Sequence, residues 1–331
     1  EVAISGGNSV TTTSTDSVTL TGGGATSSQI VIGGASTAAP AGDVTVTHTE
    51  TAVDAGGDTD ATGSTITVTG GKTITVTSNL ASGASDDAGD TLTTGAIVIT
   101  GNADTTTVSA TQTAAKARAA ANVGLVNGAV TINDVNAAST TKAGSITDVT
   151  VSSGAAVAVN SSALETLTAS GTMTTLNAGT LGALTTAAIN DLDLNLSALI
   201  STGAVTIDSD VKTLNVKVSK VVNALGVETA SNVGDLDVST SGGKTVNISG
   251  DGKLTIGALG NANAAASFIS TNTGGVTITP ALGTGVVFTG GDGADNIQIG
   301  ATTKAISTGA GNDVFITPAA LGTGGSLDGG D

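Results

Sequence analysis

Two nine-residue segments near the end of the chain hold the residues best suited to chemistry. The first, Gly290-Gly291-Asp292-Gly293-Ala294-Asp295-Asn296-Ile297-Gln298, matches G-G-x-G-x-D-x-U-x, where U is a large apolar residue. The second, Thr308-Gly309-Ala310-Gly311-Asn312-Asp313-Val314-Phe315-Ile316, departs from it only at Thr308. Glycines allow turns with positive φ that direct carbonyl oxygens inward, and the two aspartates supply negative charge. Such oxygen-rich loops are typical of calcium sites, in which about six to eight oxygens surround the ion.

The two segments start at positions 290 and 308, and this offset equals the length of two nonapeptides. In a parallel β-roll this spacing places the loops on one edge, in adjacent coils whose strands lie about 4.8 Å apart. A Ca²⁺ ion would fit between them. Ordinary glycine turns are the alternative, because the chain contains 48 Gly. The predicted metal-site residues are Gly290, Gly291, Asp292, Gly293, Asp295, Thr308, Gly309, Ala310, Gly311 and Asp313.

A nine-residue period extends beyond the two motifs. Every ninth position from 288 is large and apolar, giving the column Phe288, Ile297, Ile306 and Phe315. The intervening segment places Lys304 where the motif requires aspartate, so we expect the 299–304 loop to lie on the opposite edge without metal. The register then slips, and Gly329-Gly330-Asp331 resembles the start of a further motif. Since no Met or signal peptide opens the sequence, we expect a piece of a longer protein.

Composition restricts the protein class. Of 331 residues, 1% are aromatic, 39% are hydrophobic and none is cysteine, so neither a conventional aromatic core nor disulfides are expected. The net charge of −17 argues against nucleic acid as a partner, because nucleic-acid-binding proteins are basic. It suits a secreted protein whose charge is offset by bound calcium. No apolar run reaches the length of a transmembrane helix.

Short stretches in which apolar residues alternate with Thr, Asn or Asp recur along the chain, as in 44–47, 66–69, 74–77 and 246–248. This pattern predicts strands with one buried face, and its repetition predicts an all-β fold, a parallel β-helix or β-roll solenoid of RTX type. A β-sandwich is the alternative for residues 1–110. We expect three regions: repeats over 1–110, a solenoid over 111–280 and a calcium-binding β-roll over 281–331. The alanine-rich segment 111–122 is expected to form a short helix or turn that decorates the solenoid.

Other polar residues give weaker signals. Asp54, Asp58 and Asp60 and, further on, Asp86, Asp87 and Asp90 lie in glycine loops, either as additional calcium ligands or as solvated acids. Catalysis has little basis, because His48 is the only histidine and no nucleophile motif surrounds it. We therefore expect that the protein is not an enzyme.

Three longer segments indicate a particular protein family. The segments 285–291, 300–306 and 126–132 resemble those of the Caulobacter-type RTX surface-layer (S-layer) proteins, and the resemblance covers about residues 95–331. It implies a calcium-bound solenoid that tiles into a two-dimensional lattice on the bacterial cell surface after type I secretion. It also implies anchoring to lipopolysaccharide through an N-terminal part; neither that part nor the C-terminal secretion signal is found in this sequence.

The sequence thus favours a structural subunit of a calcium-dependent, self-assembling surface layer, with Ca²⁺ as cofactor and further copies of itself as partners. Two alternatives remain open. One is the calcium-stiffened stalk of a secreted RTX adhesin, and the other is a subunit of an extracellular filament.

Overall fold

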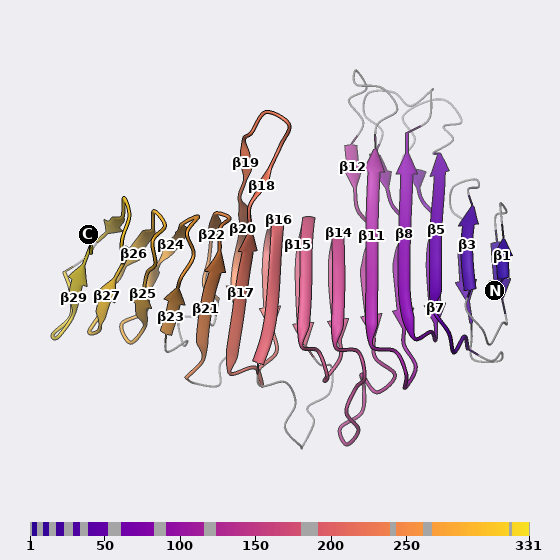
Figure 1. The fold of residues 1–331 in the computed structure, drawn as a ribbon, viewed down its shortest axis with the longest axis horizontal. Helices are drawn as coiled ribbons and strands as arrows, with labels where there is room; N and C mark the ends of the chain where they lie inside the picture. Colours follow the sequence, from indigo (N-terminus) through magenta and orange to yellow (C-terminus); the bar gives the residue numbers. More distant parts are fainter. Residues whose placement is uncertain are drawn as a thin grey trace. The chain divides into compact units, whose positions relative to one another are not determined.

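The computed structural model describes residues 2–4, 9–12, 18–22, 29–33, 39–51, 61–82, 91–115, 124–179, 191–238, 243–260, 267–317 and 320–330. These residues contain strands and turns and no helix. They form two compact units, Glu1–Leu164 with Thr180–Leu184 and Glu165–Gly179 with Thr185–Asp331. In each unit the strands stack in parallel, as in a β-helix or β-roll, so the predicted all-β fold with parallel strands is confirmed (Figure 1).

In unit 1 the strands pair across successive coils, which produces two parallel stacks. The first contains β1 (Val2–Ile4), β3 (Val18–Gly22), β5 (Val44–Thr51), β8 (Thr73–Ala81) and β11 (Thr107–Ala115). The second contains β2 (Ser9–Thr12), β4 (Gln29–Ile32), β7 (Thr65–Thr69), β10 (Ile97–Thr100) and β13 (Val130–Asn133). Parallel pairing from β1 to β11 excludes the alternative of an antiparallel sandwich for these strands.

One long strand joins the two stacks of unit 1. The first part of β14 (Asp148–Asn160) pairs with β11 and its last part pairs with β13. Between them Ser153 has φ of +62°, a left-handed conformation that turns the strand around the corner of the coil. A small third sheet in this unit consists of β6 (Ala61–Thr62), β9 (Thr91–Thr93) and β12 (Gly124–Val126).

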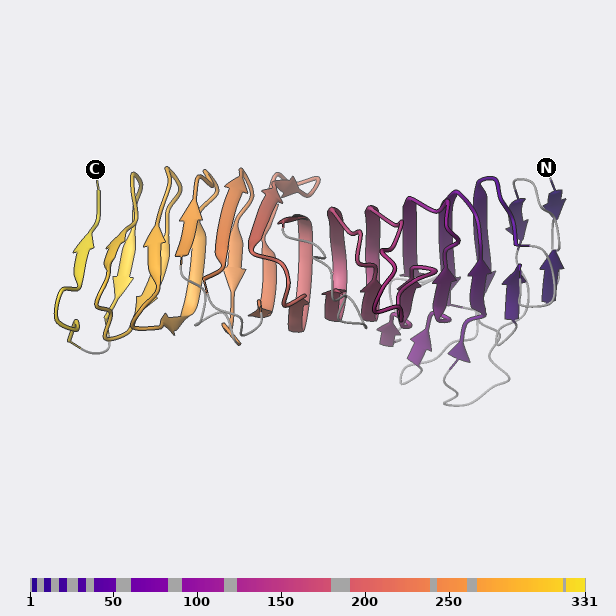
Figure 2. The ribbon, with the colours of Figure 1, turned by 90° about the horizontal axis from the view of Figure 1, so that it is seen from below.

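Unit 2 opens with two long strands, β15 (Thr166–Gly179) and β16 (Asp191–Ile207), that also bend between the stacks, at Gly171 and Ala198. The first part of β16 pairs with β17 (Thr213–Ser219). Parallel pairing then continues in the same stack through β21 (Thr245–Gly250), β23 (Ser267–Ser270), β25 (Val287–Thr289), β27 (Ala305–Ser307) and β29 (Ser326–Asp328). The last part of β16 pairs with β20 (Ser231–Asp237). The second stack continues from there through β22 (Leu254–Ile256), β24 (Val276–Leu282), β26 (Asn296–Ile299) and β28 (Val314–Ile316). Figure 2 shows both stacks of this unit.

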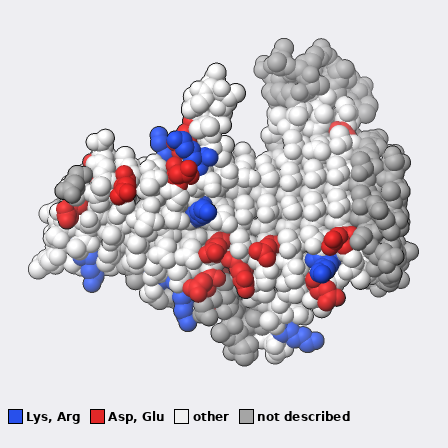
Figure 3. All heavy atoms as spheres, in the orientation of Figure 1, with Lys and Arg blue, Asp and Glu red and all other residues white. Residues whose placement is uncertain are grey.

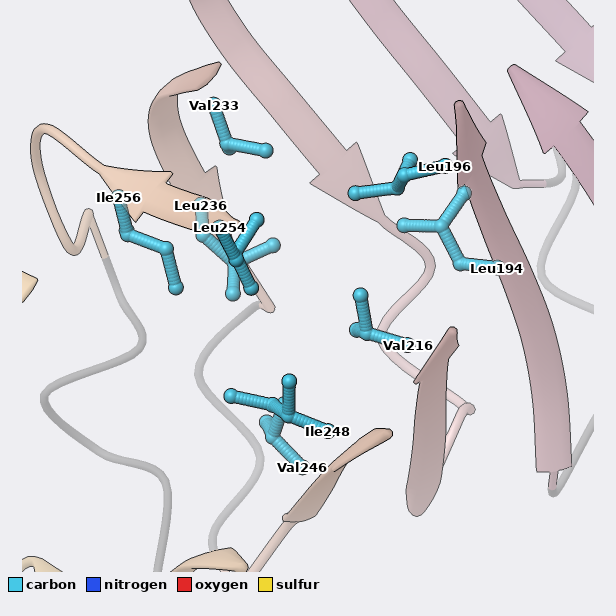
Figure 4. A pocket seen from close by; sticks show the side chains of 9 residues that line it. All are labelled: Leu194, Leu196, Val216, Val233, Leu236, Val246, Ile248, Leu254 and Ile256. Atoms are coloured by element: carbon cyan, nitrogen blue, oxygen red, sulfur yellow. The ribbon is translucent and has the colours of Figure 1, made fainter. Parts of the chain in front are cut away.

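The core follows from the alternation of residue types. In β8 the burial alternates strictly, with Ile74 and Val76 inside and Thr75 and Thr77 on the outer face. β-branched residues suit this pleated, half-buried surface. In unit 2 the strands β16, β17, β20, β21 and β22 enclose a small gap in an entirely apolar core (Figure 4), lined by Leu194, Leu196, Val216, Val233, Leu236, Val246, Ile248, Leu254 and Ile256.

Coil length differs between the two units. In unit 1, Ile74 pairs with Val108 and Val108 pairs with Val149, so each of these coils is much longer than two nonapeptides. Near the end of unit 2, Phe288 pairs with Ile306 and Ile297 pairs with Phe315, and there each coil spans two nonapeptides. The predicted register of the two motifs is therefore confirmed. The apolar column is divided, with Phe288 and Ile306 in one stack and Ile297 and Phe315 in the other.

The prediction of a short helix or turn over 111–122 is wrong for the first part of that segment. Residues 111–115 belong to β11, which pairs with β8 through Ala115, and 116–122 lie outside the described residues. The neighbouring strand offers a row of backbone hydrogen-bond partners, and this tertiary contact outweighs the intrinsic helix preference of alanine. The boundaries expected at 110 and 280 both fall within paired strands, β11 and β24, whereas the two units divide near 164.

Candidate metal centre

The turns of unit 2 alternate between its two edges because each coil contributes two strands. The loops 290–295 and 308–313 follow β25 and β27 of one stack, so both lie on the same edge. They are in direct contact: Ala310 N donates to Gly291 O at 2.8 Å, and Asp295 N donates to Asp313 Oδ1 at 2.8 Å. The predicted stacking of the two motifs is confirmed, while metal binding stays a prediction.

Glycine is required where the loops approach each other. A Cβ on Gly290 would overlap the Thr308 carbonyl oxygen and would lie 2.5 Å from Asp295 Oδ2. Gly309 has φ of +82° and lies against the carbonyl of Gly291, so a side chain there would meet both backbone strain and a clash. Gly293 is buried and Gly311 has φ of +142°, whereas the side chain of Asp292 is exposed.

The two aspartates differ in burial but share one property. Asp295 is 1% exposed, and its Oδ1 accepts a hydrogen bond from Val276 N at 2.8 Å, while Asp313 is half-buried and uses Oδ1 for Asp295 N. The second carboxylate oxygen of each, Oδ2, is buried without a hydrogen-bond partner. A buried carboxylate oxygen without a partner is costly. This cost is removed if a cation lies between the loops.

A third such oxygen comes from the residue that departs from the motif. Thr308 is completely buried, and its Oγ1 has no hydrogen-bond partner. Of the six buried side-chain atoms without a partner among the described residues, three therefore belong to this edge: Asp295 Oδ2, Asp313 Oδ2 and Thr308 Oγ1. All three are oxygens, the element that Ca²⁺ prefers as a ligand. These residues fit a calcium ion.

Asn272 lies in the coil before the two loops, and the sequence motifs did not predict its role. The loop 271–275 lies on the same edge, and Asn272 is completely buried in it. Its Oδ1 accepts hydrogen bonds from the N–H groups of Gly274 and Gly275, at 2.6 and 2.8 Å, and its Nδ2 donates to Gly252 O at 3.0 Å. This neutral amide satisfies its own loop, so we expect no cation there. The available signal was an asparagine in the glycine-containing turn that comes one coil before the first motif.

The loop that contains Lys304 lies on the opposite edge, as expected. Thr303 N donates to Thr284 O at 3.0 Å and Gly322 N donates to Thr302 O at 2.9 Å, so this loop stacks between the turns 283–286 and 320–325. Lys304 is exposed, and the buried hydroxyl of Thr302 accepts a hydrogen bond from Lys304 N at 3.1 Å. These backbone groups and the Thr302 hydroxyl of this loop therefore have hydrogen-bond partners within the protein.

Burial is the main cause that raises the pKa of Asp295 to about 6; the hydrogen bond from Val276 N opposes the rise, and the nearby charge of Asp313 adds to it. A calcium ion at this edge would therefore compete with a proton for the Asp295 carboxylate. Without calcium, the folded unit holds this proton more tightly than the unfolded chain does. The contribution of Asp295 to stability is then full below its ordinary pKa of 3.8 and is lost as the pH rises through about 6.

We expect calcium affinity to fall as the pH is lowered through about 6, by up to about tenfold for each pH unit, because one proton must leave Asp295 before the ion binds. Titration calorimetry on both sides of this pH measures the change directly. An Asp295→Asn variant is the control, since any remaining binding to it should lose this dependence. A constant affinity over the range would contradict competition at Asp295.

His48, the other residue weighed for chemistry, is 3% exposed in β5. Its Nε2 lies 3.2 Å from Glu50 Oε2. Glu50 accepts hydrogen bonds from Ser64 N at 2.6 Å and from Ser64 Oγ at 2.8 Å, so the serine hydroxyl faces the glutamate rather than the histidine. This arrangement is not that of a serine nucleophile activated by a histidine base.

Two further acidic loops were also candidates for calcium binding. Asp54, Asp58 and Asp60 and Asp86, Asp87 and Asp90 lie outside the described residues, so their role stays a prediction. Among the residues that the structure does describe, no three His, Cys, Asp or Glu side chains gather as a metal cluster. None of the described segments forms a helix with the length and apolarity needed to cross a bilayer.

The candidate centre thus consists of two carboxylates, one hydroxyl and the carbonyl groups of two stacked glycine loops on one edge of unit 2. No protein-family model matches the chain, and no curated protein is significantly similar to it.

Proposed function

We propose that this chain is a structural, non-enzymatic subunit of a calcium-dependent layer that self-assembles on the outside of a bacterial cell. The observation that carries the proposal is that Asp295, Asp313 and Thr308, which belong to two stacked loops on one edge, each hold a buried side-chain oxygen without a hydrogen-bond partner. Bound calcium would neutralise these carboxylates and hold the loops together.

Charge explains why assembly would depend on the ion. With a net charge of −17, neighbouring copies of the chain repel one another in the absence of bound cations. Calcium lowers the net charge of every copy and stiffens the loops of unit 2. Extracellular calcium, at about millimolar concentration, is sufficient for the weaker classes of calcium site. A calcium-bound solenoid of this kind suits a tile in a surface layer.

Light scattering of the purified chain tests the proposal. We expect large assemblies in millimolar calcium that dissolve when a chelator is added, and electron microscopy should show flat sheets. Magnesium at the same ionic strength is the control for simple screening of charge. Equal assembly in chelator and in calcium would contradict the proposal. Isolated rods would favour an adhesin stalk, and fibres would favour a filament subunit.

A further inference from the structure

The most exposed apolar side chains of the described residues belong to one small hairpin in unit 2. Strands β18 (Val221–Val222) and β19 (Glu228–Thr229) form the only antiparallel pair among the described strands and interrupt the path from β17 to β20. Leu225 is 87% exposed, Val227 58% and Val222 51%, whereas no other large apolar side chain described exceeds 48%. Figure 1 shows the hairpin projecting from the edge of the unit.

The hairpin is an ordered element despite its exposure. Asn223 Oδ1 accepts hydrogen bonds from Leu225 N and Val227 N at 2.9 and 3.0 Å, and Asn223 N donates to Val227 O at 2.9 Å. At its base, Glu228 accepts a hydrogen bond from Lys253 N at 2.8 Å. These bonds hold the tip in shape without help from the core. Little conformational entropy is then lost when the tip meets a partner.

Two exposed lysines flank the base of the hairpin. Lys220 immediately precedes β18, and Lys253 is tied to β19 through its backbone bond to Glu228. Lys217, which is also exposed, precedes them on β17. The nearby carboxylates of Glu228 and Asp251 accept backbone N–H groups of Lys253 and Lys220. Three lysines against two carboxylates leave the base of the hairpin with a small excess of positive charge in a chain whose net charge is −17, and Figure 3 shows blue side chains gathered there beside red ones.

The opposite edge of the same unit is acidic. Asp208 and Asp210 lie in the turn between β16 and β17, at the end of β17 away from the hairpin, and Asp237 ends β20 on that edge. All three surround Lys244, whose Nζ donates to Asp208 O at 3.0 Å. Asp235 adds a fourth carboxylate, so the four acids outnumber the two lysines here, Lys244 and the exposed Lys212 of the same turn. In Figure 3 acidic side chains gather on this side.

We propose that the hairpin edge of one copy docks on the acidic edge of unit 2 of a second copy. Lys220 and Lys253 would face the aspartates at 208, 210, 235 and 237, while Leu225 and Val227 would be removed from water. Because the two surfaces differ and lie on opposite edges, the contact is heterologous and repeats in an open array unless a rotation closes it into a ring. This inference rests on the proposed function and specifies its interface.

The test compares assembly of four variants of the whole chain in millimolar calcium by light scattering and electron microscopy. The tip variant carries Leu225→Ser and Val227→Ser, and its control carries Val135→Ser, which replaces a 47% exposed valine of unit 1. Two charge variants, Lys220→Glu and Asp210→Lys, probe the facing surfaces. We expect the tip variant to raise the critical concentration for assembly at least tenfold, and the control to assemble like the parent. Calcium affinity should stay unchanged in the tip variant, which shows that unit 2 is folded.

Charge exchange gives the sharper result. Each charge variant alone should assemble poorly. A mixture of the two should assemble better than either, because the hairpin edge that carries Lys220→Glu can then face the acidic edge that carries Asp210→Lys. If the parent assembles and the tip variant does so equally well, the hairpin contact is wrong and the surface-layer proposal stands. A parent that stays monomeric in calcium overturns both.

Discussion

Asp295→Ala is expected to abolish calcium binding at the edge formed by loops 290–295 and 308–313. The substitution removes the most buried carboxylate of the centre, together with the Oδ2 that has no protein partner. We expect a loss of affinity of at least about 100-fold, the upper end of what even residues behind metal ligands contribute. Asp313→Ala should have the same effect, since its carboxylate contacts Asp295 N.

Titration calorimetry measures the stoichiometry and affinity of each variant. Asp292→Asn is the matched control, because Asp292 lies in the same loop with an exposed side chain and keeps its carbonyl group after substitution. We expect parent-like binding to this control. The same stoichiometry and affinity in Asp295→Ala as in the parent would show that the ion is not held here.

The second large effect concerns stability. Phe288→Ala should lower the free energy of unfolding of unit 2 by about 3–5 kcal/mol, because it opens a cavity at a completely buried position. Phe288 pairs with Phe268 on one side and with Ile306 on the other, so the cavity lies between two large side chains that the strands hold in place.

Phe315→Ala is the comparison, since Phe315 belongs to the same ladder of short coils but is only half-buried. We expect less than half the destabilisation of Phe288→Ala. Urea unfolding in saturating calcium, followed by circular dichroism, measures both variants. Equal losses would show that burial does not control stability along this ladder.

The sequence predicted the parts of the fold that depend on local patterns. Alternation of Val and Ile with Thr revealed the strands, and the interval of two nonapeptides between Gly290 and Thr308 correctly placed the two loops on one edge. Both signals lie in the order of residue types, because side chains of a strand alternate between its faces and because the coils at 290–316 have constant length.

Features that depend on neighbouring coils escaped prediction. The strand at 111–115 follows from pairing with β8, against the preference of its alanines. Ser153 and Ala198 adopt positive φ at corners of the coil. A glycine at these positions would have indicated the corners in the sequence. The roles of Asn272 and of the Thr308 hydroxyl were also hidden, because both depend on which atoms the adjacent loop brings near.

The shortening of the coils has a consequence for the order of folding. Closing a loop costs entropy that grows with its length, and chains rich in local contacts fold faster. The pairs Phe288–Ile306 and Ile297–Phe315 each close a loop that is two nonapeptides long. The pair Val108–Val149 closes a loop of more than twice that length. In unit 2 the short coils that contain loops 290–295 and 308–313 should therefore form first. Their strands would then act as a template for Phe268 and the longer coils before it. Calcium would act on this nucleus, so the ion would control the rate of folding as well as the stability of the folded unit.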